Sequence, residues 1–140
     1  MKDRLLRYLG LLLLRVGTGV VFTIFGFDKL IHPFNWVGWV PIVVRKQVEA
    51  THLLTIFRFL KLQGVAEGVL GVLILVGVWT RLSALLCAAV LAGIVYFLGW
   101  DQIGIRDTGL LFSSLALSLL GAGEWSVDGG CGAKIRRRKR

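Results

Sequence analysis

Residues 64–100 read GVAEGVLGVLILVGVWTRLSALLCAAVLAGIVYFLGW, and this stretch decides the fold. It consists of two apolar runs, residues 64–79 and 82–100, that are separated only by Thr80 and Arg81. Each run approaches the ~20 residues that a helix needs to cross the ~30 Å hydrocarbon core of a bilayer. Because the joint is only two residues long, the stretch predicts two antiparallel transmembrane helices.

The composition of the whole chain agrees with a membrane location. Of its 140 residues, 56% are hydrophobic and 18% are charged, and the mean hydropathy is +0.75. A soluble domain of this size could not bury so much apolar surface. We therefore predict a multi-pass protein of the cell (plasma) membrane, in contact with the lipid bilayer. The length allows one domain, residues 1–128, followed by a short tail, residues 129–140.

Two further apolar runs flank the central pair. Residues 5–27 are predicted to form a first, uncleaved span, because the run is too long for a signal peptide and contains Arg15. Residues 103–121 are predicted to form the fourth span. The expected fold class is an all-α bundle of four transmembrane helices.

The segment between the first two spans has a different character. Pro33, Trp36, Trp39 and Pro41 lie within nine residues of one another, which favours an irregular segment at the level of the lipid head groups. From about Val43 the chain is expected to become helical again and to lead into the second span.

The positive charge is concentrated at the end of the chain. The stretch from Gly121 onward is rich in glycine and then basic, so we predict that most of it is disordered. Its basic cluster favours a contact with anionic lipid or a partner, and not with nucleic acid, which would require basic residues spread over a folded face. The positive-inside rule then predicts that both termini are cytoplasmic. The cluster consists of Lys134, Arg136, Arg137, Arg138, Lys139 and Arg140.

Glu67 is the residue that an apolar span does not explain. A carboxylate inside a membrane costs a few kcal/mol unless it is paired or protonated, so Glu67 is a candidate proton acceptor. No other catalytic residue is identified. Glycines at helical spacing allow another helix to approach Glu67 closely. The glycines expected to pack helices together are Gly19, Gly26, Gly64, Gly68 and Gly71.

The partner of Glu67 has two candidates in the sequence. Arg15 lies inside the first span, on the face that also carries Gly19 and Gly26. Arg106 is expected at a depth similar to that of Glu67, with Asp107 and Asp28 nearby. These charges could fix the packing of the helices, line a polar pocket that opens to the outer leaflet, or reach the interface.

Metal and cofactor chemistry lacks a recognisable motif. His32 and His52 are the only histidines, and no cysteine or histidine pair has the spacing of metal ligands. We therefore expect no metal site and no resident cofactor.

Three stretches together resemble the DoxX family of small four-span membrane proteins. They are LLRVGTGVVFTIFGFDKL at residues 13–30, the central pair of runs at 64–94, and RDTGLLFSSLALSLLGAGEWSVD at 106–128. The resemblance implies the four-helix fold and an association with membrane-bound oxidoreductases. Since no redox group is evident in the chain, the mobile redox species would be a membrane quinone.

Three functional hypotheses follow. In the first, the protein is a non-catalytic or accessory membrane subunit of an oxidoreductase complex and binds a quinone around Glu67. In the second, it is a small homo-oligomeric transporter or channel. In the third, it is a membrane scaffold whose basic tail holds a partner protein or anionic lipid.

Overall fold

A computed structural model describes residues 2–52 and 54–128 and is helical, with no strand in that part of the chain. Four helices are long and apolar enough to cross a membrane, which confirms the predicted four-span bundle. The basic cluster of the tail lies outside the described residues. The helices are α1 (Lys2–Ile31), α2 (Pro33–Val37), α3 (Ile42–Ala50), α4 (Ile56–Val76), α5 (Thr80–Leu98) and α6 (Gln102–Leu120).

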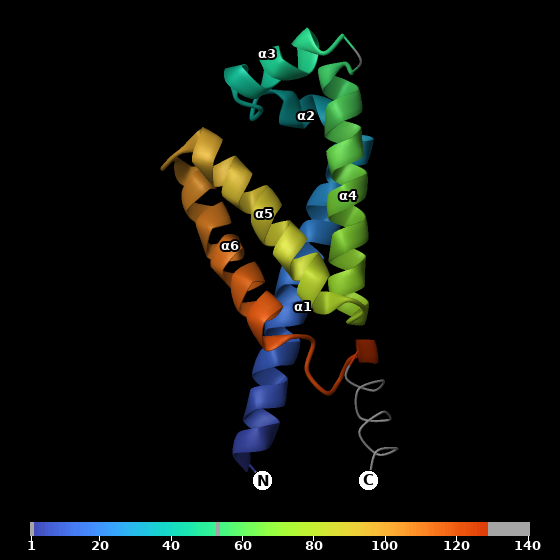
Figure 1. Ribbon diagram of the computed structural model, residues 1–140, viewed down its shortest axis with the longest axis vertical. Coiled ribbons are helices and arrows are strands. Elements are labelled where there is room, and N and C mark those ends of the chain that lie inside the picture. Colours follow the sequence, from blue (N-terminus) through green and yellow to red (C-terminus); the bar gives the residue numbers. More distant parts are fainter. Residues whose placement is uncertain (1, 53, 129–140) are drawn as a thin grey trace.

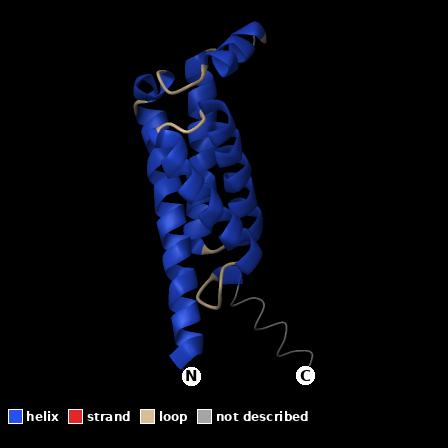
Figure 2. Cartoon of the chain, turned by 90° about the vertical axis from the view of Figure 1, so that its left-hand side faces the viewer, coloured by secondary structure: helices blue, strands red, loops and turns tan. Residues whose placement is uncertain are grey.

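The bundle is built from two helix pairs. α1 packs along α4, and α5 packs along α6 (Figure 1). The pairs meet near the turn between α4 and α5 and diverge toward the opposite end, where α2 and α3 lie. Figure 2 shows the same arrangement from the side, with the short helices at one end and the N-terminus at the other.

Glycines set the close approach of α1 and α4. A Cβ on Gly26 would meet the backbone nitrogen of Gly68, and a Cβ on Gly71 would lie 2.5 Å from the backbone nitrogen of Thr23. Gly64 faces the carbonyl oxygen of Gly26, and Gly19 faces Leu75 and the carbonyl of Gly71. The structure thus brings the five glycines of the sequence analysis to a single helix contact, where a Cβ would be too close to the other helix at every position except Gly68.

The first span is longer than expected. α1 continues through Asp28 and Lys29 to Ile31 instead of ending at residue 27. The extra turn is helical because the side chain of Lys29 faces α4 and not solvent, and Lys29 is only 5% exposed. The apolar run therefore underestimated the length of the helix.

The turn of the central pair lies three residues earlier than predicted. Gly77 ends α4 in the left-handed conformation (φ 79°), which glycine adopts without strain, and donates its N–H to the carbonyl of Leu73. Thr80 and Arg81, which the sequence suggested as the joint, form the first turn of α5.

The helix expected from about Val43 is present as α3, and it is separate from the second span. α3 ends at Ala50, the backbone changes direction around His52 (φ 53°), and α4 starts afresh at Ile56. α3 buries none of its residues, so nothing in the bundle fixes it as an extension of α4.

Residues 121–128, at the start of the stretch that we predicted to be mostly disordered, are held by contacts with other parts of the bundle. The carboxylate of Asp128 accepts hydrogen bonds from the backbone N–H groups of Trp79 (3.1 Å) and Thr80 (2.9 Å). Arg15 donates to the carbonyl oxygens of Ala122 (3.0 Å) and Trp125 (2.7 Å). This C-terminal segment therefore closes the bundle over the turn between α4 and α5.

Candidate ligand-binding cavity

A cavity of about 490 Å³ lies between the two helix pairs, at the end where they diverge. α1 and α4 form one wall, and the facing ends of α5 and α6 form the other. The segment from Trp36 to Val44 covers it. Most of the lining is apolar or aromatic, including Phe25, Phe59, Leu91, Ile94 and Phe97.

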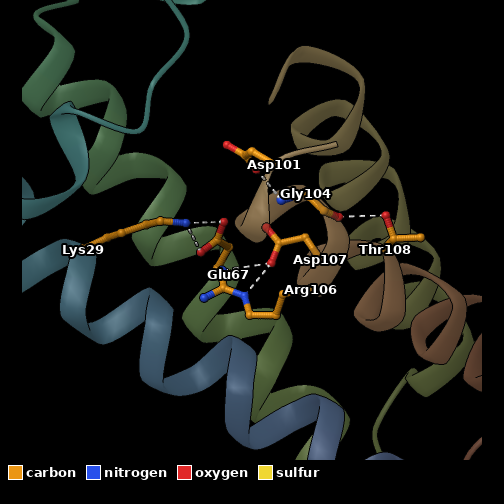
Figure 3. Close-up of polar contacts among 7 residues, drawn as sticks. All are labelled: Lys29, Glu67, Asp101, Gly104, Arg106, Asp107 and Thr108. Atoms are coloured by element: carbon orange, nitrogen blue, oxygen red, sulfur yellow. Dashed lines mark hydrogen bonds and ion pairs between the residues drawn. The ribbon is translucent and has the colours of Figure 1, made fainter. Parts of the chain in front are cut away.

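A buried ion pair forms part of the polar lining of the cavity. The Nζ atom of Lys29 donates to both carboxylate oxygens of Glu67, at 2.7 and 2.5 Å (Figure 3). Gln63, one turn earlier on α4, donates to the same carboxylate at 2.9 Å. Glu67 is 3% exposed, so three hydrogen bonds balance its charge where little water can reach it.

The partner of Glu67 is therefore Lys29, which follows the predicted first span at residues 5–27 and was not one of the two candidates, Arg15 and Arg106. A signal for it was present in the sequence. The stripe Arg15, Gly19, Phe22, Gly26 continues in helical steps to residue 29, so a longer α1 would have carried Lys29 toward the bundle.

Arg15 belongs to the other end of the molecule. Its guanidinium holds the C-terminal segment through Ala122 and Trp125, so it does not take part in the charge network around Glu67. Arg15 and Glu67 therefore form no pair, since each has its own partners.

Arg106 and Asp107 add a second charged group to the cavity, from the α6 side. Oδ1 of Asp107 accepts a hydrogen bond from Nε of Arg106 at 2.9 Å, and Nη2 of Arg106 lies 2.9 Å from the same oxygen in an ion-pair contact. Asp107 is 5% exposed, whereas the side chain of Arg106 is 47% exposed and lies over the ring of Phe25 at 5.0 Å. Figure 3 shows the Lys29–Glu67 pair and the Arg106–Asp107 pair side by side.

Trp36 links the segment that covers the cavity, residues 36–44, to the Lys29–Glu67 pair. The Nζ atom of Lys29 lies 4.7 Å from the centre of the Trp36 ring, and Phe25 contacts the same ring edge-on at 5.5 Å. The indole N–H of Trp36 donates to Asp28 at 2.7 Å. Asp28, which we had grouped with the pocket charges, thus holds the cover in place together with its contact to His32.

The cavity narrows into a packed apolar core toward the other end of the bundle. Phe22, Ile74, Leu91 and Leu117 form this core cluster with small residues of α5, and Ile74 and Leu117 are fully buried. A water-filled path from the cavity to the C-terminal segment would have to pass these side chains.

Within residues 2–52 and 54–128, no three His, Cys, Asp or Glu side chains are grouped closely enough to hold a metal ion. The charged groups around the cavity are instead arranged as two ion pairs. Pairs of this kind bind polar organic groups through hydrogen bonds.

The family of the chain follows from comparison with known proteins. The DoxX family model matches residues 10–100. The chain belongs to the DoxX family. The comparison with curated proteins finds no match. The comparison with solved structures finds none either.

The DoxX match covers α1 to α5, including Lys29, Gln63 and Glu67. Arg106 and Asp107 lie beyond it, on α6, although the sequence resemblance we noted extended to residue 128. Of the two ion pairs at the cavity of this DoxX protein, Lys29–Glu67 therefore lies inside the family match and Arg106–Asp107 follows it.

Proposed function

We propose that this DoxX-family membrane protein binds the head group of a membrane quinone in the cavity and serves as an accessory subunit of an oxidoreductase. The observation that carries the proposal is an aromatic, mostly apolar cavity with the buried Lys29–Glu67 pair in its wall. Small-molecule sites commonly combine apolar walls with a few placed polar groups. A quinone has this character, since a flat ring with polar oxygens carries an isoprenoid chain.

The volume and the position of the cavity support the same ligand class. About 490 Å³ lies within the range of ligand pockets, ≈ 300–1,000 Å³, and leaves space beside a quinone ring for the first part of its chain. The cavity lies between membrane-spanning helices, so a lipid-soluble ligand is the kind that can reach it. Association with an oxidoreductase is what membership of the DoxX family suggests.

The apolar core cluster supports a binding site over a transport pathway. Phe22 and Leu91 belong both to the cavity lining and to the core below it, so the cavity is closed on that side. A transporter with this architecture would need to separate the two helix pairs during each cycle. We therefore favour the quinone hypothesis over the transporter.

The orientation and the remaining partners are part of the proposal. Both ends of the described chain lie at the Arg15 end of the bundle, which the positive-inside rule assigns to the cytoplasm, because residues 2–7, Arg81 and the basic tail outweigh the basic residues at the cavity end. The cavity would then open in the outer leaflet, and the tail would be available to anionic lipid or to a partner subunit.

Filling the cavity tests the function. Gly93 lines the cavity, and a Cβ built there meets no atom within 4 Å, so Gly93→Phe fills empty space. We expect protein purified in mild detergent to carry extractable quinone, measured by mass spectrometry, and the variant to lose at least about tenfold of it because the ring site is occupied.

Gly109→Phe is the matched control, because Gly109 also lies inside a helix with open space around its Cβ but does not line the cavity. It should keep the quinone content of the wild type. Absence of quinone from the wild-type protein, both as purified and after incubation with a short-chain quinone, would contradict the proposal.

A further inference from the structure

The hydrogen-bonding groups that line the cavity are not all used within the protein. Glu67 accepts from Lys29 and Gln63, and its two oxygens are both engaged. Lys29 donates to both of these oxygens and also faces the Trp36 ring. The indole N–H of Trp36 is bonded to Asp28. These groups hold the site together and leave little capacity for a ligand.

Asp107 is different. Its Oδ1 atom takes the hydrogen bond and the ion-pair contact from Arg106, and for Oδ2 no hydrogen bond is found within residues 2–52 and 54–128. In Figure 3 the second oxygen points away from the guanidinium and carries no contact. Asp107 is nevertheless 5% exposed and lines the cavity. Within the described residues, Oδ2 is not among the fully buried atoms that lack a partner, so it keeps accessible surface, and a ligand in the cavity can donate a hydrogen bond to it.

We infer that Asp107 makes the cavity selective for the reduced, hydroquinone form of its ligand, with Oδ2 accepting a hydrogen bond from a ring hydroxyl. The inference rests on the proposed function and specifies the redox state of the ligand. A quinone presents only carbonyl oxygens, which are acceptors, and would place one of them against the carboxylate. A hydroquinone presents an O–H group, which is the donor that the site lacks.

Arg106 completes the site, and the selectivity itself comes from Asp107. The guanidinium of Arg106 forms an ion pair with Oδ1 of Asp107 and lies over the ring of Phe25. Of its five N–H groups, the one on Nε donates to Asp107, and a remaining one can donate to the oxygen of a ring hydroxyl or of a quinone carbonyl alike. Donor and acceptor then lie next to each other on α6, opposite the Lys29–Glu67 pair.

The test compares three probes that differ only at the ring oxygens. They are a decyl-substituted benzoquinone, its hydroquinone kept reduced under anaerobic conditions, and the dimethyl ether of that hydroquinone. Their affinities for the full-length protein in detergent are measured by equilibrium dialysis. We expect the hydroquinone to bind at least about tenfold more tightly than either of the others, since a hydrogen bond to a charged group is worth that much.

Asp107→Asn should abolish the preference, because an amide both donates and accepts and can serve a carbonyl as well as a hydroxyl. The matched control is Glu49→Gln, which removes an exposed carboxylate of α3 that does not line the cavity, and it should keep the preference. The comparison of the hydroquinone with its dimethyl ether uses only the wild-type protein, so the inference stays testable even if Asp107→Asn does not fold.

Each outcome is decisive. Equal binding of the three probes to the wild-type protein, or a preference that survives in folded Asp107→Asn, would overturn the inference and leave quinone binding intact. Binding of none of them would overturn the proposed function as well. A lipid hydroxyl has the same donor chemistry, so dioctanoylglycerol is tested as a competitor. If it displaces the hydroquinone at equal concentration, the ligand is a lipid and the assignment to hydroquinone is wrong.

Discussion

The ammonium group of Lys29 and the carboxylate of Glu67 lie where neither could be tolerated alone. Both residues are almost completely buried, between two helices that contact each other through glycine. Removing one member of a buried pair leaves an uncompensated charge, whereas replacing both by apolar residues is often neutral or stabilising. The contribution of each side chain therefore depends on the presence of the other.

We predict strong coupling between the two residues. Glu67→Met and Lys29→Met should each lower the thermal midpoint in detergent by about 10 °C, which corresponds to about 3–5 kcal/mol for a broken buried pair. The double variant should recover most of this loss. The measurement is a double-mutant cycle by circular dichroism. A double variant as unstable as the sum of the two singles would contradict it.

The site could be predicted from sequence only in part. Glu67 is conspicuous because its neighbours are apolar, and this holds whatever the fold. Lys29 is not conspicuous, because it follows Asp28 at the edge of an apolar run. A lysine at such a position suggests a residue at the interface between membrane and water. Asp107 was placed near Glu67 from its expected depth, whereas Trp36 enters the cavity through the packing of α2, and no local pattern encodes that contact.

Among the helices, α1 and α4 make the closest contact of the bundle. The backbones approach closely because both helices carry glycine at the contact, and a Cβ would be too close to the other helix at each of these glycines except Gly68. They are Gly19 and Gly26 on α1, and Gly64, Gly68 and Gly71 on α4. In a membrane, where apolar burial does not drive association, van der Waals packing of this kind holds helices together.

A single methyl group should therefore have opposite effects at two places on α1. At Gly26 the added Cβ would meet backbone atoms of Gly64 and Gly68, so Gly26→Ala should destabilise the protein by about 1–3 kcal/mol through overpacking. At Gly17 no atom lies within 4 Å, so Gly17→Ala should be neutral or stabilising by up to about 1 kcal/mol, as helix propensity suggests.

Thermal unfolding of the two variants in the same detergent checks this prediction. Equal midpoints for Gly26→Ala and Gly17→Ala would show that the helices do not depend on the glycine contact. The helices themselves were predictable because each span is a long apolar run. Their ends were not, because Gly77 and the burial of Lys29 decide them, and both depend on tertiary contacts.

On the scale of the whole molecule, the C-terminal segment joins elements that are far apart in the chain. Asp128 caps the first turn of α5 and donates its own N–H to the carbonyl of Gly77 (3.0 Å), while Arg15 of α1 holds the carbonyls of Ala122 and Trp125. Its two glycines and its lack of an apolar period offered no signal for these contacts. The contacts that order it come from three other elements.

Loss of this cap should be visible locally. Asp128→Ala should remove about 0.5–2 kcal/mol of capping energy and speed amide hydrogen exchange at residues 79–83. Exchange in the first turn of α6, which has its own cap from Asp101 to Gly104, should not change. Val127→Ala, at an exposed position of the same segment, is the control and should leave both regions unaffected.

The separation of Lys29 and Glu67 along the chain has a consequence for biogenesis. The two residues are 38 positions apart and belong to different spans, so the ribosome delivers them one after the other. At about 5–20 residues per second, Lys29 waits roughly 2–8 s before Glu67 is even synthesised. During that interval its ammonium group must remain with the translocon or at the head groups. The final depth of the first helix is thus set only when the second one arrives.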